Sequence, residues 1–551
     1  MAHCVAPVLE AVGESRLRRT RSSLELPGVL LFTVLGFLAM GYHPGLEDDG
    51  IYLSAVKADL NPALFPHNAD FFRLQMQATA FDGLMAHFVR WTHMPLAWAE
   101  LVWQLVALFL ILWAVKKIAN LLFRDSSARW AAVAMVAGVF TLPVAGTALY
   151  MADQHLHPRT LATAMILLAV WRILNGSGRS NARARSRSIP RGLKPQSSLG
   201  SFGTTEVVPF RDTVYAASSR KHWQAAALLL VAFLMHPLMA AMGISFCCFL
   251  TVALMEQLHV RLRWLRSATF ALVPLGWVFE PADATWRKAL DTRTYYYLYQ
   301  WTWYEWLGAL APMILFGLLW RFAHKRGETL LARFAAAVFF YALFQQVLAM
   351  AMLWPSSLVR LTPLQPMRYL HLEYFLFMMM AGAMLGRFVL QRSVWRWAVF
   401  LLAINGSMFL WQRAEFSGVE HLELPGRAPA NPWLQAFAWI RVNTPESAYF
   451  ALDPHYMEVP GEDFHEFRAL AERSQLADAV KDAAVVTQVP ELGPVWASQV
   501  TAEEGWRNFK LADFERLKAA FGVDWVLVAH PQPEGLACRW HNDSLAVCQI
   551  P

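Results

Sequence analysis

The chain has 551 residues, of which 56% are hydrophobic and 16% are charged, and its formal net charge is +7. A soluble protein of this length carries more charge, so the composition excludes an ordinary soluble enzyme and predicts a polytopic α-helical membrane protein. Basic loops that face anionic lipid heads account for the net charge. We therefore expect membrane lipids as partners and no nucleic-acid partner.

Apolar runs predict about 11 transmembrane helices. The first run, 26–42, follows four arginines and is not followed by a small-residue cleavage site, so we expect a retained anchor. The other runs are 97–115, 130–150, 160–174, 224–236, 238–257, 267–279, 306–322, 333–353, 370–387 and 396–412. The runs 224–236 and 267–279 are short for a membrane span, which indicates tilted or broken helices.

The distribution of basic residues predicts the orientation of these helices. With the N-terminus in the cytoplasm, the cytoplasmic segments hold 28 Lys and Arg, and the outer loops hold 9. Positively charged loops stay on the cytoplasmic side. An odd number of spans then places the C-terminal part outside, which in a bacterial inner membrane is the periplasm.

Composition divides the chain into a membrane domain, 1–412, and a C-terminal α/β domain, 413–551. Within the first, 176–221 is rich in Ser, Arg, Gly and Pro and predicts a disordered cytoplasmic loop. In the second, helices are predicted at 431–442 and 511–521, and strands at 447–452 and 523–529. Alternating helices and strands favour an α/β layer fold.

Two cysteines of the C-terminal domain are placed to form a disulfide. Cys538 and Cys548 flank a turn around Asp543, and a hairpin at that turn would set them opposite each other. Free buried thiols are the alternative. A disulfide implies an oxidising compartment such as the periplasm.

An acidic cluster, Glu47, Asp48 and Asp49, directly follows the first apolar run. Carboxylates held together at a membrane surface are costly unless a metal, a cation or a chemical step uses them. An ionised aspartate there can act as a general base toward an acceptor hydroxyl. Alternatively, Asp48 and Asp49 could hold a divalent metal such as magnesium or manganese.

Other outer segments carry side chains that could complete a site. Arg368 and Arg360 have the fork that binds phosphate, although contact with the outer leaflet is the alternative. Tyr296 belongs to an aromatic stretch, 294–306, that suits either a sugar or the membrane interface. His236 precedes Pro237, where a helix break with a satisfied imidazole is the simpler interpretation. A further loop offers candidate cavity-lining or metal-binding groups: Asp153, His155, His157 and Arg159.

The acidic cluster in the first outer loop and His157-Pro158 in the second, within this layout, resemble the GT-C superfamily of membrane glycosyltransferases. The C-terminal domain resembles the outer domains of uncharacterised bacterial proteins of this type, through the stretches 439–445, 467–468, 472–474 and 521–525. The resemblance implies a lipid-phosphate-linked sugar donor and a catalytic or metal-binding acid in the first outer loop. The chain lacks a WWDYG-type signature, so protein N-glycosylation is not expected.

The leading hypothesis is therefore a bacterial inner-membrane glycosyltransferase that moves a sugar from a polyprenyl-phosphate donor to a periplasmic acceptor. Asp48, Asp49 and Glu47 would supply the base or hold the metal, and Arg368 with Arg360 would bind the donor phosphate. A transporter or flippase is the first alternative, and it predicts charged groups at mid-membrane depth. A non-catalytic envelope assembly protein is the second. The sequence predicts no oligomeric state.

Overall fold

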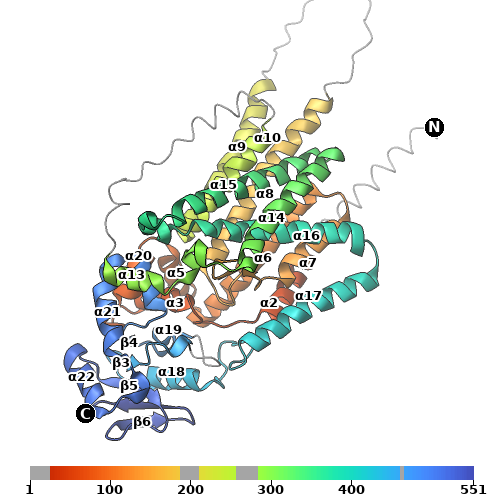
Figure 1. Cartoon of the computed structure of the whole chain (residues 1–551). Coiled ribbons are helices and arrows are strands. Elements are labelled where there is room, and N and C mark those ends of the chain that lie inside the picture. Colours follow the sequence, from red (N-terminus) through yellow and green to blue (C-terminus); the bar gives the residue numbers. More distant parts are fainter. Residues whose placement is uncertain (1–24, 187–209, 256–282, 459–464) are drawn as a thin grey trace, which may run out of the picture.

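The computed structural model describes residues 25–186, 210–255, 283–458 and 465–551. A bundle of long helices stands on one side of a smaller domain that contains the C-terminal sheet (Figure 1). The bundle consists of α2 (Glu25–Met40), α6 (Leu96–Leu122), α7 (Ser126–Gly138), α8 (Pro158–Ser186), α9 (Phe210–Met235), α10 (Pro237–Leu254), α14 (Trp303–Lys325), α15 (Thr329–Leu353), α16 (Tyr369–Leu385) and α17 (Val394–Glu415).

In the described part of the chain, six helical segments are long and apolar enough to cross a membrane. They are 96–122, 237–254, 303–325, 329–353, 366–390 and 394–415. Two shorter apolar helices, Glu25–Met40 and His222–Met235, accompany them. The protein is therefore a multi-pass membrane protein, as its composition predicts, but the count of eleven spans is not confirmed.

Three predicted segments differ from the structure or lie partly outside the described residues. The span predicted at 130–150 is wrong in its second half, because α7 ends at Gly138 and the chain then forms the hairpin β1 (Pro143–Val144) and β2 (Leu149–Tyr150). The run 267–279 lies outside the described residues. Helices α8 and α9 extend into the loop predicted at 176–221, of which 187–209 also lies outside the described residues.

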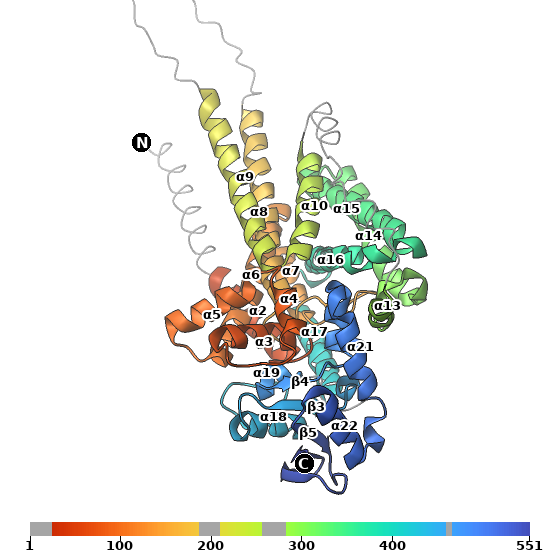
Figure 2. The ribbon, with the colours of Figure 1, turned by 90° about the vertical axis from the view of Figure 1, so that its left-hand side faces the viewer.

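The segment between α2 and α6 forms three short helices, of which the first two pack on the C-terminal domain and the third packs on α6 (Figure 2). These are α3 (Asp49–Leu60), α4 (Asp70–Met76) and α5 (Phe81–Thr92). Lys57 of α3 pairs with Glu472 at 2.7 Å, and the Asn68 amide donates to Gln499 at 2.8 Å. Residues 41–95 are called the first loop below, and these contacts fix it against the C-terminal domain.

A buried carboxylate, that of Glu423, links the first loop to the C-terminal domain. Glu423 accepts hydrogen bonds from two fully buried imidazoles, His43 of the first loop at 2.7 Å and His465 of the C-terminal domain at 2.9 Å. Both histidines hold the pKa of Glu423 down at about 2 despite its burial, which alone would raise it. The carboxylate is therefore ionised at neutral pH and bridges both segments.

The C-terminal domain has a mixed five-stranded sheet with strand order β4-β3-β5-β7-β6. Strand β3 is parallel to both β4 and β5, while β7 is antiparallel to β5 and β6. The elements in chain order are α18 (Pro432–Asn443), β3 (Tyr449–Leu452), α19 (Phe467–Ala471), β4 (Ser474–Gln475), α20 (Lys481–Gln488), α21 (Gly493–Ala502), α22 (Leu511–Phe521), β5 (Trp525–Ala529), β6 (Ala537–His541) and β7 (Leu545–Gln549). The predicted α/β character of this domain is present.

Apolar side chains cover both faces of this sheet. Phe437 of α18 and Phe467 of α19 pack with Phe450 on one face, and Phe514 of α22 packs with Val526 on the other. Cys538 and Cys548 are paired across β6 and β7 and form a disulfide. The hairpin that the sequence predicts therefore forms one edge of the sheet, with β6 as the outermost strand.

We expect Gly50→Ala to lower the thermal unfolding midpoint of the purified protein. A Cβ at Gly50 would lie 2.2 Å from the Cβ of Glu466, so α3 and the C-terminal domain would be forced apart. Overpacking of this kind costs about 1–3 kcal/mol. Gly83→Ala is the matched control in α5, since no described atom lies within 4 Å of its added Cβ. An unchanged midpoint for Gly50→Ala would show that this interface yields without cost.

Candidate functional site

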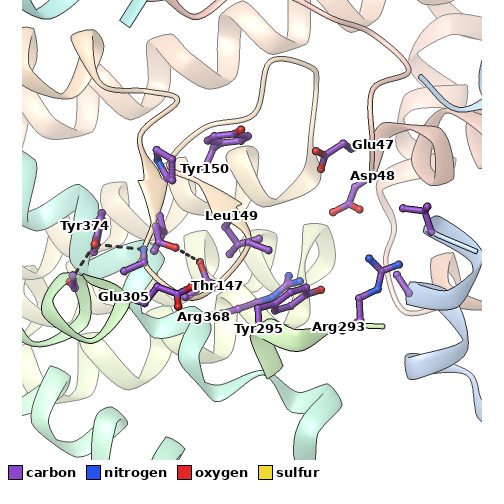
Figure 3. A pocket seen from close by; sticks show the side chains of 18 of the residues that line it. Glu47, Asp48, Thr147, Leu149, Tyr150, Arg293, Tyr295, Glu305, Arg368 and Tyr374 are labelled. Atoms are coloured by element: carbon purple, nitrogen blue, oxygen red, sulfur yellow. Dashed lines mark hydrogen bonds between the residues drawn. The ribbon is translucent and has the colours of Figure 1, made fainter. Parts of the chain in front are cut away.

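A cavity of about 860 Å³ lies where the bundle meets the C-terminal domain. Its walls come from the first loop, the β1–β2 hairpin, the segment before α14, the start of α16 and α20 (Figure 3). Its polar and charged lining residues include Glu47, Asp48, Thr147, Tyr150, Arg293, Tyr295, Tyr304, Glu305, Arg368, Tyr374, Glu458 and Lys481. Segments distant in sequence thus contribute charges of both signs to one space.

Asp48 is the central carboxylate of this cavity. Lys481 Nζ lies 3.2 Å from Asp48 Oδ1 and 3.5 Å from Glu47 Oε2, and His157 Nε2 lies 3.9 Å from Asp48 Oδ2. Burial alone would raise the pKa of Asp48, but Lys481 and His157 hold that pKa well below its usual range. Asp48 is therefore ionised at neutral pH and open to the cavity.

Asp49 has a different environment from its neighbour. Its side chain is buried and its Oδ2 accepts the Gly45 N–H at 2.6 Å. Because α3 begins at Asp49 and successive helical residues diverge by about 100°, Asp48 and Asp49 do not face the same space. Burial raises the pKa of Asp49. Asp49 is not among the residues that line the cavity.

The contacts of Asp48 and Asp49 differ from those expected of two ligands that share a magnesium or manganese ion. Asp49 is engaged by a backbone N–H and Asp48 by the Lys481 ammonium, so the two carboxylates do not form a chelating pair. The described residues contain no group of three or more His, Cys, Asp and Glu side chains placed to hold a metal ion. In the described part of the chain, Asp48 and Asp49 therefore do not together form a site for a divalent metal.

The cavity is not lined by the four predicted residues of the second outer loop, Asp153, His155, His157 and Arg159. The Arg159 guanidinium donates to Asp153 at 2.6 Å, and the His157 Nδ1 accepts the Arg159 N–H at 2.9 Å. Both ring nitrogens of His155 are buried, without a hydrogen bond from the described residues. Burial and the Arg159 charge lower the pKa of His157 to about 4, so its imidazole is neutral behind Asp48 at neutral pH.

His236 also fails to line the cavity. It is the N-cap of α10, where its side chain accepts the Met239 N–H at 3.4 Å. Its ring stacks on that of His157 with 6.1 Å between the centroids. The simpler interpretation of the sequence, a helix break with a satisfied imidazole, therefore describes this residue.

Arg368 lines the cavity just before α16 begins. Its Nε donates to the side-chain oxygen of Gln365, whose amide in turn donates to the Tyr296 hydroxyl at 2.7 Å. Tyr296 is buried behind Gln365, and its neighbour Tyr295 lines the cavity instead. Tyr296 is thus two hydrogen bonds away from Arg368 and positions it indirectly.

Arg360 does not join Arg368. It lines a separate cavity of about 240 Å³ together with Asp283, Trp286 and Gln488. Seven residues separate the two arginines. Arg360 lies within the 3-10 segment Ser356–Leu364, and the left-handed residue Gln365 follows that segment and turns the chain before Arg368. The structure therefore places Arg368 in the candidate site and Arg360 outside it, so the expected phosphate contact of Arg360 stays a prediction.

Sequence reasoning missed two cations of the cavity. Arg293 directly precedes the aromatic stretch 294–306, and its Nε and Nη2 have no hydrogen-bond partner among the described residues. Lys481 begins α20 and reaches the cavity only because the C-terminal domain packs there. The position of Arg293 beside an outer aromatic stretch could have indicated that it belongs to the site. No feature of the sequence around Lys481 indicates that it reaches the cavity.

No protein-family model and no curated protein matches the chain. Three solved structures that are similar to it are of an oligosaccharyltransferase from Archaeoglobus fulgidus. One carries a tethered acceptor peptide with the sequon NVT (12% identity, TM-score 0.48), one is the apo form (10%, 0.44) and one is a complex with zinc and sulfate (12%, 0.43). They cover 92%, 92% and 91% of this chain and 69%, 69% and 68% of the oligosaccharyltransferase chain. At these identities and TM-scores, nothing about the reaction of this chain follows from the likeness.

Proposed function

We propose that this protein is a GT-C-type glycosyltransferase that moves a sugar from a polyprenyl-phosphate donor to an acceptor hydroxyl. The reaction takes place in the cavity, which faces the periplasm of a bacterial inner membrane, with the N-terminus in the cytoplasm. The observation that carries the proposal is the meeting of an ionised Asp48 with Arg293 and Arg368 in one cavity. Its volume of about 860 Å³ lies within the range of about 300–1,000 Å³ typical of small-molecule sites.

Each charge has a chemical task in this reaction. Asp48 accepts the proton of the acceptor hydroxyl as its oxygen attacks the anomeric carbon. The bond between that carbon and the phosphate oxygen breaks, and the electron pair leaves with the phosphate. Arg293 and Arg368 neutralise the departing phosphate through charge-assisted hydrogen bonds.

Lys481 keeps Asp48 charged before the acceptor arrives. Its ammonium group raises the free energy of protonating Asp48, and burial of Lys481 excludes water that would screen the pair.

Aromatic faces of Tyr150, Tyr295 and Tyr304 line the same space and suit the apolar face of a sugar ring. The C-terminal domain thus completes the site and borders the acceptor.

One observation favours transport as a second candidate function. Glu373 lies within α16, is fully buried, and neither of its carboxyl oxygens has a hydrogen-bond partner in the described residues. Ionisable groups inside membrane helices mark ion and proton pathways in transporters. A flux assay with lipid-linked sugar in proteoliposomes separates the two, since a transporter moves the lipid without cleaving its phosphate–sugar bond.

We expect Asp48→Asn to abolish sugar transfer in vesicles that contain lipid-linked sugar donors. The amide cannot accept the proton, and loss of a general base costs about 10²–10⁴-fold in rate. Transfer is measured as radioactive sugar released from the lipid onto acceptor. Asp59→Asn is the matched control, because Asp59 is an exposed residue of α3 that does not line the cavity. Transfer by Asp48→Asn at the wild-type rate would contradict the proposed site.

A further inference from the structure

A second charged cavity, of about 680 Å³, lies at the other end of the bundle. It is bounded by the N-terminus of α7, the C-terminus of α16 and the start of α17. Four arginines line it, namely Arg124, Arg129, Arg387 and Arg392, together with one carboxylate, Asp125. This excess of positive charge has no role in the proposed reaction.

Helix α16 separates the two cavities. Arg368, just before its first residue, lines the candidate site, and Gly386, just after its last residue, lines the second cavity. Seventeen helical residues span about 25 Å, close to the thickness of the hydrocarbon core of a bilayer. Helix α7 packs against α16, where Ser127 Oγ donates to the Gly386 carbonyl at 2.8 Å. The second cavity thus lies at the membrane face opposite the candidate site.

Three of the four arginines are available to a ligand. Arg387 is neutralised by Glu328, at 2.7 Å, and lies 3.7 Å from Asp125. Among the described residues, no carboxylate forms an ion pair with Arg124, Arg129 or Arg392. The Asp125 side chain does not cap α7, so the first N–H groups of this 13-residue helix, at Ser126 and Ser127, also border the cavity.

The remaining wall is aromatic. Phe32 of α2, Trp130 of α7 and Trp397 of α17 line the cavity beside the arginines. Tryptophan is enriched at the depth where lipid headgroups meet acyl chains. Basic pockets between transmembrane helices bind anionic headgroups, and the guanidinium fork matches phosphate oxygens. The chemistry of the cavity is therefore that of a phosphate with an attached apolar group.

We propose that this cavity binds the phosphate headgroup of an anionic glycerophospholipid from the leaflet opposite the candidate site. Arg124, Arg129 and Arg392 contact the phosphate together with the N-terminus of α7, and the aromatic wall contacts the glycerol and the first carbons of the chains. The bound lipid joins α17 to α7 at this face. This inference does not depend on the proposed transferase reaction.

Native mass spectrometry of the full chain in detergent tests the inference with phosphatidylglycerol and phosphatidylcholine as probes. We expect retention of phosphatidylglycerol at least about tenfold above phosphatidylcholine, which carries no net charge. In Arg124→Gln with Arg392→Gln, the Kd for phosphatidylglycerol should rise roughly 30-fold, because two basic contacts to an anionic headgroup are lost. The single variant Arg392→Glu, at an exposed position, should also retain less phosphatidylglycerol than the wild type.

The matched control removes the same charge elsewhere on this face. Arg321 and Lys325 are exposed residues near the end of α14 that do not line the cavity, so Arg321→Gln with Lys325→Gln should retain the lipid. Equal retention of both lipids, equal loss in the control, or no loss in either cavity variant would overturn the proposal. Complete displacement of the lipid by millimolar inorganic phosphate would also overturn it, because the site would then take a soluble anion.

Discussion

The double variant Arg293→Gln with Arg368→Gln is expected to lose about 10²–10⁴-fold in kcat/KM for a lipid-linked sugar donor. Both guanidinium groups line the cavity that holds Asp48. Each hydrogen bond between charged groups is worth about 1.5–3 kcal/mol, and the phosphate gains charge as the sugar leaves. The loss is measured from initial rates of transfer at several donor concentrations, which separate kcat from KM.

Two further variants sharpen this result. The single variant Arg368→Lys should also transfer sugar more slowly than the wild type. Its ammonium group lacks the planar fork that Gln365 holds in place in Arg368. Arg360→Gln should transfer sugar at the wild-type rate, since Arg360 lines the separate cavity. If Arg360→Gln lost activity and the double variant kept it, the assignment of the phosphate site would be reversed.

Replacing Arg468 by methionine is expected to destabilise the C-terminal domain by about 3–5 kcal/mol. The guanidinium is buried and binds both oxygens of Asp482, at 2.9 and 2.6 Å, and one oxygen of Glu466 at 3.3 Å. Without Arg468, two carboxyl groups stay buried without their cation. The change is measured as a lower thermal unfolding midpoint in detergent solution.

The same variant should also affect the candidate site, because Asp482 directly follows Lys481 at the start of α20. Arg507→Met is the control, since the Arg507 side chain is exposed and its ion pair with Asp453 has an N–O distance of 3.8 Å. Adding Asp482→Leu to Arg468→Met should recover part of the stability by removing a buried carboxyl group that has lost its partner. Equal midpoints for Arg468→Met and Arg507→Met would show that the buried pair contributes nothing.

The parts of the fold that could be predicted from the sequence are those governed by local signals. Asn431 caps α18 by accepting the N–H groups of Trp433 and Leu434, and Gly522 ends α22 in the left-handed region. These residues stand beside the elements that they delimit, so both helices were predicted within one residue. The six helical segments that are long and apolar enough to cross a membrane likewise coincide with predicted apolar runs.

Apolar composition alone misled the prediction at 130–150. Both a membrane helix and a buried hairpin are apolar, so hydropathy does not distinguish them. Pro143 begins β1, and Gly146, which lies in the left-handed region, belongs to the turn between β1 and β2. Proline and glycine both disfavour the interior of a helix, so these two residues indicate that α7 ends before them, as it does at Gly138.

The candidate site was predictable only in part. The position of an acidic cluster after the first span identified Asp48, but which of the two neighbouring aspartates faces the cavity depends on where α3 begins. The contribution of Lys481 depends on how the C-terminal domain packs against the first loop, and no local pattern records that. Tertiary contacts therefore decide which charges meet.

The position of Lys481 has a consequence for when the candidate site assembles. Lys481 and Asp48 are 433 residues apart in the chain, and the ribosome adds about 5–20 residues per second. A growing polypeptide thus exposes its acidic residues for many seconds before their cationic partner is translated. In the proposed reaction, Asp48 therefore has its cationic partner only after the C-terminal domain has been translated and has packed against the first loop.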